Sequence, residues 1–143
     1  MNYQTLTIEP EGEIATLTFN RPDKRNAISP EMIRELIEAL GEVESGPAKV
    51  LILTGAGKAF SAGMDLEALR ALVTATAAEE SARLNREDSE RIAAMFRRIF
   101  DFPKVTIAAV NGPAIAGGCG IATLCDLTLA APEAKFGYTE VRI

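Results

Sequence analysis

The stretch VNGPAIAGGCGIATLCD, from Val110 to Asp126, places four of the 11 glycines of the chain within positions 112–120. Glycine loses more backbone freedom on folding than any other residue, so this concentration needs a physical reason. The apolar run at 105–110 predicts a strand, and we expect a helix to begin near Gly117. Unpaired N–H groups at a helix N-terminus attract anions, as in an oxyanion hole. The alternative is that the glycines allow close packing of the strand against the helix. The spacing by itself favours this packing role.

The rest of the chain alternates strand-like and helix-like segments. Two runs within 3–19 predict a pair of strands. Ser29 is a good N-cap and Pro30 suits the first helical position, so we expect a helix from there to Gly41 or Gly46. The other expected elements are strands at 49–55, 105–110, 127–131 and 134–141, and helices at 65–73, 91–100 and 119–125. This order indicates an α/β fold.

The segment 74–90 is polar and rich in alanine, and its pattern allows either a helix or a mobile loop. It is the expected mobile insertion of the domain. The final run, KFGYTEVRI, is apolar and strand-like, so we expect the chain to be a fragment whose later elements cover this edge.

Composition bounds the class of protein. The chain has 143 residues, 48% hydrophobic and 24% charged, which is typical of one soluble globular domain. A net charge of −5 argues against nucleic acid or an anionic membrane surface as partner, although local backbone dipoles can still bind a small anion. No signal peptide and no run of membrane-spanning length is visible, so we expect a cytoplasmic protein.

Histidine is absent, which excludes histidine bases, Ser-His-Asp and Cys-His arrangements and histidine-type zinc sites within this chain. Cys119 and Cys125 lie in an apolar segment and form no CxxC pair, so we expect two buried thiols in a reducing compartment.

The loop of small residues after the strand at 49–55 matches no complete catalytic motif. TGAGKAF, at 54–60, lacks the glycine and the Ser or Thr that a phosphate-binding loop needs. AFSAG, at 59–63, half matches a nucleophile elbow, but Ala59 replaces the first glycine and no histidine can activate Ser61. The loop is either a close-packing element or a segment whose backbone is functional.

Four motifs occur together along the chain: NRPDKRNAIS, GKAFSAGMDL, VNGPAIAGGCGIATLCDLTLAA and KFGYTEV. Their order and spacing resemble the crotonase superfamily, specifically the enoyl-CoA hydratase/isomerase family, over essentially the whole chain. The resemblance implies a ClpP/crotonase-like spiral of ββα units, with residues 1–143 forming the acyl-CoA-binding core and a C-terminal helical part missing. It also implies an acyl-CoA substrate, no separate cofactor or metal, and assembly as a homotrimer or hexamer.

The same resemblance implies a site. Two backbone N–H groups, those of Met64 and Gly117, would bind the thioester oxygen, because enolate formation places negative charge there. CoA would lie along Lys24, Arg25 and Ala27, along Ala59, Ser61, Ala62, Gly63, Met64, Asp65 and Leu66, and along Gly117 and Gly118. Lys24 and Arg25 would pair with CoA phosphates, or else form an exposed, solvated turn. Asp65 is expected chiefly to cap the helix that begins there.

One departure from the family pattern concerns its carboxylates. Family hydratases use two glutamates, and the first position is Gly120 here, whereas the second is Glu140. Moving a double bond from the 3,4 to the 2,3 position needs only one proton carrier, so Glu140 is the candidate base, expected to have a raised pKa. The alternative is an exposed strand glutamate.

Three hypotheses remain open. The first is a single-base enzyme such as a Δ3-Δ2-enoyl-CoA isomerase. The second is an enoyl-CoA hydratase of fatty-acid or branched-chain breakdown. The third is a non-catalytic CoA-binding subunit, which the absence of a side chain at Gly120 keeps open.

Overall fold

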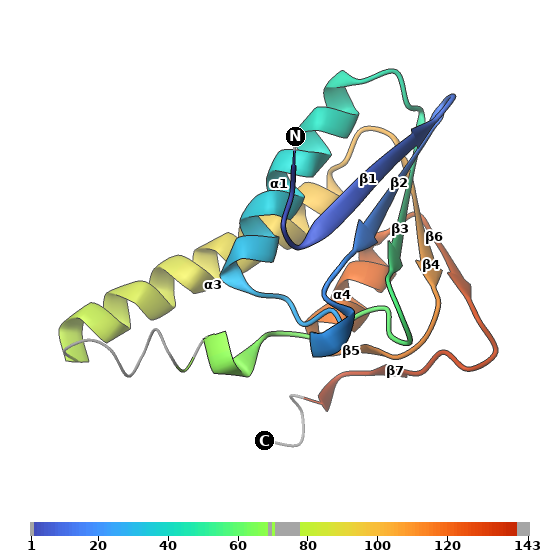
Figure 1. The fold of residues 1–143 in the computed structure, drawn as a ribbon. Helices are drawn as coiled ribbons and strands as arrows, with labels where there is room; N and C mark the ends of the chain where they lie inside the picture. Colours follow the sequence, from blue (N-terminus) through green and yellow to red (C-terminus); the bar gives the residue numbers. More distant parts are fainter. Residues whose placement is uncertain (1, 69, 71–77, 140–143) are drawn as a thin grey trace.

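A computed structural model describes residues 2–68, 70 and 78–139. Within them, one sheet in the order β1-β2-β3-β4-β6 forms the centre of the fold (Figure 1). β1 and β2 form an antiparallel hairpin, and β2, β3, β4 and β6 run parallel to one another. The strands are Leu6–Glu11 (β1), Ile14–Phe19 (β2), Val50–Gly55 (β3), Val105–Val110 (β4) and Leu127–Ala130 (β6). The expected α/β architecture is confirmed.

Helix α1, Pro30–Ser45, begins and ends where its sequence predicts. The Ser29 hydroxyl accepts a hydrogen bond from the Met32 N–H at 3.2 Å, and Gly46 is the C-cap. Two of its own residues, Leu36 and Leu40, are fully buried. The helix contacts β1 and helix α3, and so covers one face of the sheet (Figure 1).

Helix α3, Ala78–Phe100, is longer than the sequence predicts. Of the two alternatives for 74–90, the helix is confirmed from Ala78 onward and the mobile loop is wrong there; residues 74–77 lie outside the described part. Alanines and an i,i+4 ion pair between Arg83 and Glu87 (3.2 Å) favour the helix there.

The C-terminal half of α3 carries the apolar side that its spacing predicts. Met95 and Ile99 are buried, and Ile92 and Phe96 pack partly buried against the core. The helix ends before Pro103, as expected.

After β4 the chain forms a short strand β5, Ala114–Ile115, and helix α4, Gly117–Leu124. The helix begins at the glycine that the sequence indicates. β5 pairs in parallel with β7, Phe136–Gly137, in a separate two-stranded sheet. The strand expected at 134–141 is therefore only two residues long within the described residues.

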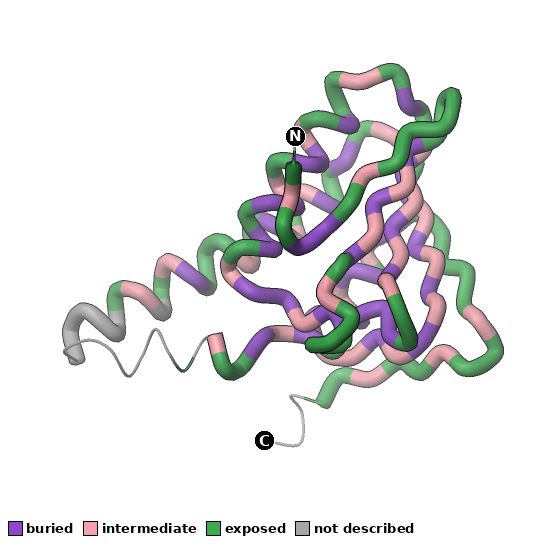
Figure 2. Tube along the Cα trace, in the orientation of Figure 1, coloured by how far each residue is buried: buried purple, intermediate pink, exposed green. Residues whose placement is uncertain are grey.

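The core lies between the sheet and the helices, where Figure 2 shows the buried segments of β2, β3, β4 and α1. Cys119 and Cys125 are free, buried thiols, as expected, and burial raises the pKa of Cys125 to about 11. Among the described helices, none combines the length and the apolar character needed to cross a bilayer.

Candidate functional site

The side chain of Asn26 joins two segments that carry the predicted site, the turn after β2 and the loop after β3. It is fully buried, and its amide nitrogen donates to the carbonyl oxygens of Ala56 (2.9 Å) and Ala59 (2.8 Å). Its amide oxygen accepts from the Arg21 N–H at 2.9 Å. Asn26 has a φ of 55°, a left-handed conformation that asparagine tolerates better than most residues. Sequence reasoning missed Asn26; its only signal was an asparagine closing a proline-containing turn.

The third segment, around β5, is hydrogen-bonded to the same loop. The N–H groups of Phe60 and Ser61 share the carbonyl oxygen of Pro113 (3.1 and 3.2 Å), and the Ile115 N–H donates to the Ser61 carbonyl at 2.9 Å. A Cβ added at Gly118 would lie 2.7 Å from the Cβ of Ser61. Close packing therefore explains the glycine at 118.

The backbone N–H of Met64 points away from the segment with which this residue pairs. The Gly63 carbonyl accepts a hydrogen bond from the Ile28 N–H at 2.8 Å, and the Asp65 N–H donates to the Ile28 carbonyl at 2.9 Å. In a trans peptide group the C=O and N–H bonds point in opposite directions, and the described residues contain no cis peptide bond. The Gly63–Met64 peptide therefore directs its N–H away from Ile28, and within the described residues this N–H has no hydrogen-bond partner.

The N–H of Gly117 also points away from its own secondary-structure element. The Ala116 carbonyl accepts from the Gly120 N–H at 3.0 Å, so the N–H of that peptide group points out of the N-terminus of α4. It too lacks a hydrogen-bond partner in the described part of the chain. Ala116 has a φ of 52°, and strained backbone of this kind gathers at functional sites.

The two N–H groups belong to neighbouring residues in space. A Cβ on Gly63 would lie 3.4 Å from the Gly117 nitrogen, and a Cβ on Gly117 would lie 3.6 Å from the Met64 sulfur. Within the glycine-rich stretch, Gly118 thus allows close packing and Gly117 leaves a backbone N–H without a partner in the described residues.

A cavity of about 450 Å³ opens beside these donors. Its only hydroxyls in the described part are those of Thr123 and Tyr138, whose oxygens lie 3.0 Å apart. At Gly120 the wall is closed by Phe96, since a Cβ added there would lie 3.0 Å from the Phe96 Cε1. The lining residues are Met64, Ile92, Phe96, Ala116, Gly117, Gly120, Thr123, Leu124 and Tyr138. Both predicted donors therefore border one largely apolar cavity.

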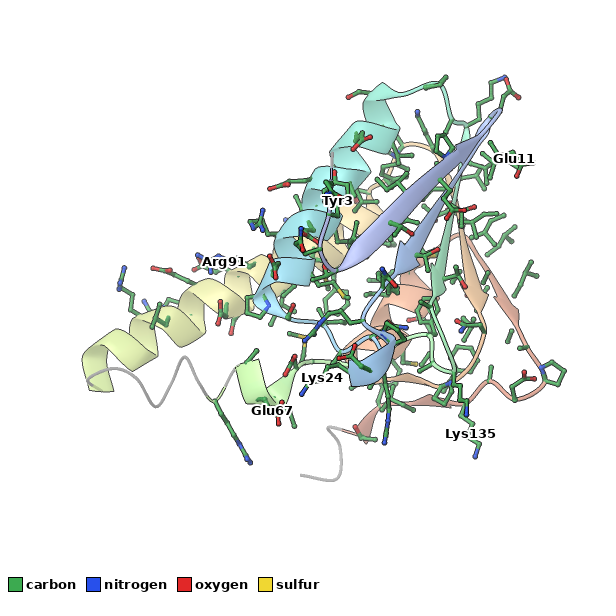
Figure 3. All side chains as sticks on the ribbon, in the orientation of Figure 1. Tyr3, Glu11, Lys24, Glu67, Arg91 and Lys135 are labelled. Carbon is green, nitrogen blue, oxygen red and sulfur yellow. The ribbon has the colours of Figure 1, made fainter. Side chains whose placement is uncertain are left out.

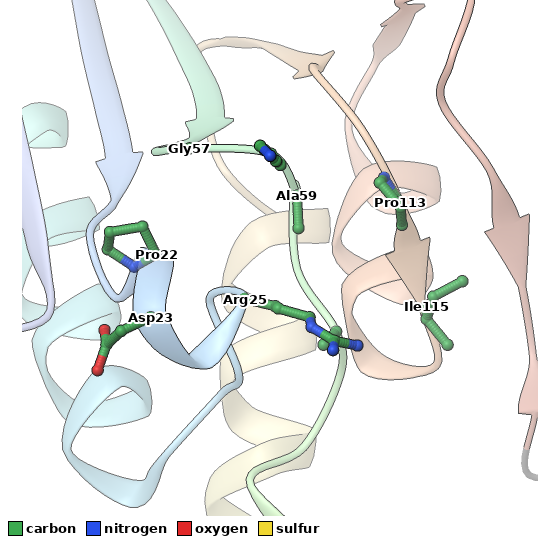
Figure 4. Close-up of a pocket in the computed structure, with 9 residues that line it drawn as sticks. Pro22, Asp23, Arg25, Gly57, Ala59, Pro113 and Ile115 are labelled. Carbon is green, nitrogen blue, oxygen red and sulfur yellow. The ribbon is translucent and has the colours of Figure 1, made fainter.

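A second cavity, of about 650 Å³, is lined by residues of the turn after Pro22 and of the loop after β3, and Figure 4 shows Arg25 extending from that turn. Of the residues expected along CoA, Arg25, Ala59 and Ala62 line it. Lys58 lines it as well and was not singled out from the sequence. The charged residues of this cavity are thus two cations, Arg25 and Lys58, and one carboxylate, Asp23.

Two other predicted residues hold charged partners. Lys24 and Glu67 face each other on the surface, 2.7 Å apart (Figure 3), and this hydrogen bond raises the pKa of the Lys24 ammonium. Asp65 accepts the Ala68 N–H at 3.1 Å, so it caps the helical residues 66–68 as expected. Burial opposes ionisation of Asp65, but this bond and its contact with Arg21 outweigh burial and lower its pKa.

The remaining predicted residues are spread over different environments. Ser61 is buried, and its hydroxyl donates to the Asn26 carbonyl at 2.8 Å. Ala27 is half-buried, whereas Leu66 is exposed. Glu140, the candidate base, lies outside the described residues.

Comparisons with known proteins identify the family of the chain. The family model described as enoyl-CoA hydratase/isomerase matches residues 9–143. A Thermus thermophilus protein named for enoyl-CoA hydratase activity is 47% identical over 93% of this chain and 51% of its own length. The hydroxycinnamoyl-CoA hydratase-lyase of Pseudomonas fluorescens is 41% identical over 97% of this chain and 50% of its own.

Solved structures of related proteins have the same fold. The solved structure of an enoyl-CoA hydratase/isomerase from Xanthobacter autotrophicus Py2 superposes with a TM-score of 0.86 and 36% identity, over 99% of this chain and 51% of that one. The chain thus has the crotonase-type fold that the resemblance implies, and it spans about half the length of the curated relatives it matches. The chain belongs to the enoyl-CoA hydratase/isomerase family.

Proposed function

We propose that the full-length protein acts on an acyl-CoA thioester and holds the thioester oxygen between the N–H groups of Met64 and Gly117. The observation that carries this proposal is the orientation of these two unpaired donors beside one apolar cavity. Proton removal alpha to a thioester, or addition at its beta carbon, develops negative charge on that oxygen. Each preorganised donor stabilises such charge by about 3 kcal/mol.

We propose that the two cavities hold different portions of the substrate. The larger one is lined by Ala62 and Ile115, and the smaller one by their near neighbours Met64 and Gly117. We place the CoA portion in the larger cavity, with its phosphates near Arg25, and the acyl portion in the smaller one. Lys24 joins the phosphates by exchanging its exposed partner Glu67 for them; CoA is part of the substrate, so no separate cofactor is required.

The preferred reaction is double-bond isomerisation through a single carboxylate, Glu140. It is supported by the wall at Gly120, which has no side chain and is closed by the apolar ring of Phe96. In this reaction Glu140 takes a proton from C2 of a 3-enoyl-CoA, electrons move onto the thioester oxygen, and the same proton returns at C4. The product is the conjugated 2-enoyl-CoA.

Hydration of a 2-enoyl-CoA is the second candidate, favoured by the names of the relatives. It needs a group that activates water and a source of the proton that C2 receives. Because Gly120 occupies the position of the first glutamate of family hydratases, hydration would require a group other than a carboxylate at 120 to act together with Glu140. A non-catalytic CoA-binding subunit is the third reading, which either turnover would exclude.

Matched 3-enoyl-CoA and 2-enoyl-CoA substrates, given to the full-length protein, separate these candidates. An isomerase increases the absorbance of the conjugated thioester from the first substrate and loses this activity in Glu140→Gln. A hydratase decreases the absorbance of the second. Binding of CoA without either change would leave only the binding role.

Two further expectations accompany this function. We expect the full-length protein to assemble as a homotrimer or hexamer, which sedimentation or light scattering measures. We also expect it to work in the cytoplasm, where CoA thioesters are metabolised.

A further inference from the structure

We propose that Arg21 is a positioning residue that orients and polarises the Met64 N–H through two consecutive peptide groups. This inference rests on the proposed function, because it concerns the strength of the oxyanion donor. Arg21 borders neither of the two cavities of the candidate site, so it acts through other residues rather than on the substrate.

The first link joins Arg21 to the peptide group between Ala27 and Ile28. The Nη1 of Arg21 donates to the Ala27 carbonyl oxygen at 2.5 Å. That carbonyl and the Ile28 N–H belong to one trans peptide group and point in opposite directions. A hydrogen bond from a charged guanidinium is stronger than one between neutral groups, and it draws electron density toward the carbonyl oxygen.

The second link passes this polarisation to Met64. The Ile28 N–H donates to the Gly63 carbonyl oxygen at 2.8 Å, and the opposite end of that peptide group is the Met64 N–H. Hydrogen bonds arranged in a chain polarise one another, more so where water is excluded. Ile28 is buried, so water is excluded from the middle of this series of hydrogen bonds, between Arg21 and the Met64 N–H.

Asp65 holds the guanidinium in place. Its Oδ2 lies 2.9 Å from the Arg21 Nη2, and its side chain is 9% exposed against 21% for Arg21. The guanidinium of Arg21 thus contacts Ala27, which precedes Ile28, and Asp65, which follows Met64. It stabilises both segments of the pairing between Ile28 and Met64. Lysine carries the charge but not this two-directional geometry.

The test uses the full-length protein with a chromophoric conjugated thioester, 4-dimethylaminocinnamoyl-CoA, whose absorbance moves to longer wavelength when its carbonyl is polarised. The variants are Arg21→Gln, Arg21→Lys and Asp65→Asn. The matched control is Glu67→Gln. It breaks the exposed ion pair between Lys24 and Glu67 but leaves the hydrogen bonds from Arg21 through Ile28 to Gly63 unchanged.

We expect Arg21→Gln to reduce the wavelength shift of the bound thioester and to lower kcat roughly tenfold, because the donor is weakened rather than removed. Arg21→Lys restores part of both, since a cation is retained. Asp65→Asn keeps the cation and the helix cap, and so keeps most of the wavelength shift. Glu67→Gln leaves the spectrum of the bound thioester unchanged.

Equal wavelength shifts in wild type, Arg21→Gln and Arg21→Lys would overturn the inference, whatever their melting temperatures. Equal losses in Arg21→Gln and Asp65→Asn would also overturn it, because they would indicate a purely structural clamp. Absence of any shift in the wild type would instead contradict the oxyanion site itself, so the two failures are distinguishable.

Discussion

The aromatic ring of Phe96 lies directly over Gly120, so that a Cβ added to the glycine would lie 3.0 Å from the ring Cε1 and 3.2 Å from the Cζ. Phe96 comes from α3 and Gly120 from α4, and both border the cavity beside the proposed oxyanion site. The ring therefore occupies the direction that any side chain at position 120 would take. This contact determines what chemistry the cavity wall can supply.

We expect the protein to accommodate a carboxylate at position 120 only if Phe96 is replaced by a smaller residue. We expect Gly120→Glu alone to destabilise the protein by about 2 kcal/mol, because the ring must move and a charge must enter an apolar wall. Combining it with Phe96→Ala relieves the crowding, and the double variant is expected to gain hydration of 2-enoyl-CoA relative to Phe96→Ala alone. Urea denaturation and the absorbance of the conjugated thioester measure the two effects.

Strictly additive effects of Gly120→Glu and Phe96→Ala on stability would contradict this coupling, since residues in contact are expected to interact. Ala94 provides the matched control: it lies exposed on the same helix, so Ala94→Gly reports the cost of a small change in α3 without a change at the cavity.

Asn26 is expected to determine whether the loop at 56–63 keeps its shape. Asn26→Ala leaves the carbonyls of Ala56 and Ala59 without their donor and places alanine at a φ of 55°, so we expect a loss of about 3 kcal/mol in the free energy of unfolding. Asn26→Gly removes the same hydrogen bonds but tolerates the φ, and should cost about 1 kcal/mol less. If both variants unfold at the urea concentration of the wild type, the side chain does not hold the loop.

Glu35 is expected to make stability depend on pH. Its buried carboxylate accepts the N–H groups of Gln4 and Thr5 and the Thr5 hydroxyl, at 2.8, 2.8 and 2.6 Å. Burial opposes ionisation, but these hydrogen bonds outweigh it and lower the pKa of Glu35. Because the pKa is lower in the folded state, the stabilisation is complete above the unfolded pKa of about 4.3 and is lost as pH falls through the folded value.

The measurement is urea denaturation of wild type and Glu35→Gln at pH values from about 7 down to about 3. At neutral pH we expect the variant to be less stable by about 2 kcal/mol, with the difference shrinking in acid. Glu38→Gln, an exposed change on the same helix, is the control. A difference that stays constant with pH would exclude this role.

The local elements of the fold could be predicted from sequence because their signals are local. Ser29, Pro30 and Gly46 mark the ends of α1, and the apolar run at 105–110 marks a buried strand. The start of α4 at Gly117 follows from the glycine cluster. Each of these signals lies within a few residues of the feature that it predicts.

What the sequence did not predict depends on contacts between distant residues. The pairing of β5 with β7, the hydrogen bonds from Asn26 to Ala56 and Ala59, and the closure of Gly120 by Phe96 each join segments at least 20 residues apart. From Ala78 the chain takes the helical alternative that the sequence left open for 74–90, and α3 as a whole contacts α1 and α4. Periodicity and spacing contain no record of such partners.

The central claim is that the Met64 and Gly117 N–H groups bind the thioester oxygen, and replacing one N–H by an ester oxygen tests it most directly. In the full-length protein, an α-hydroxy acid at position 117 deletes the donor and keeps the chain geometry. The same replacement at Gly120, whose N–H bonds to Ala116, controls for loss of a helix hydrogen bond. The account predicts that the change at 117 lowers kcat by roughly 100- to 1000-fold and the change at 120 far less; a kcat at 117 equal to that of the wild type would contradict it.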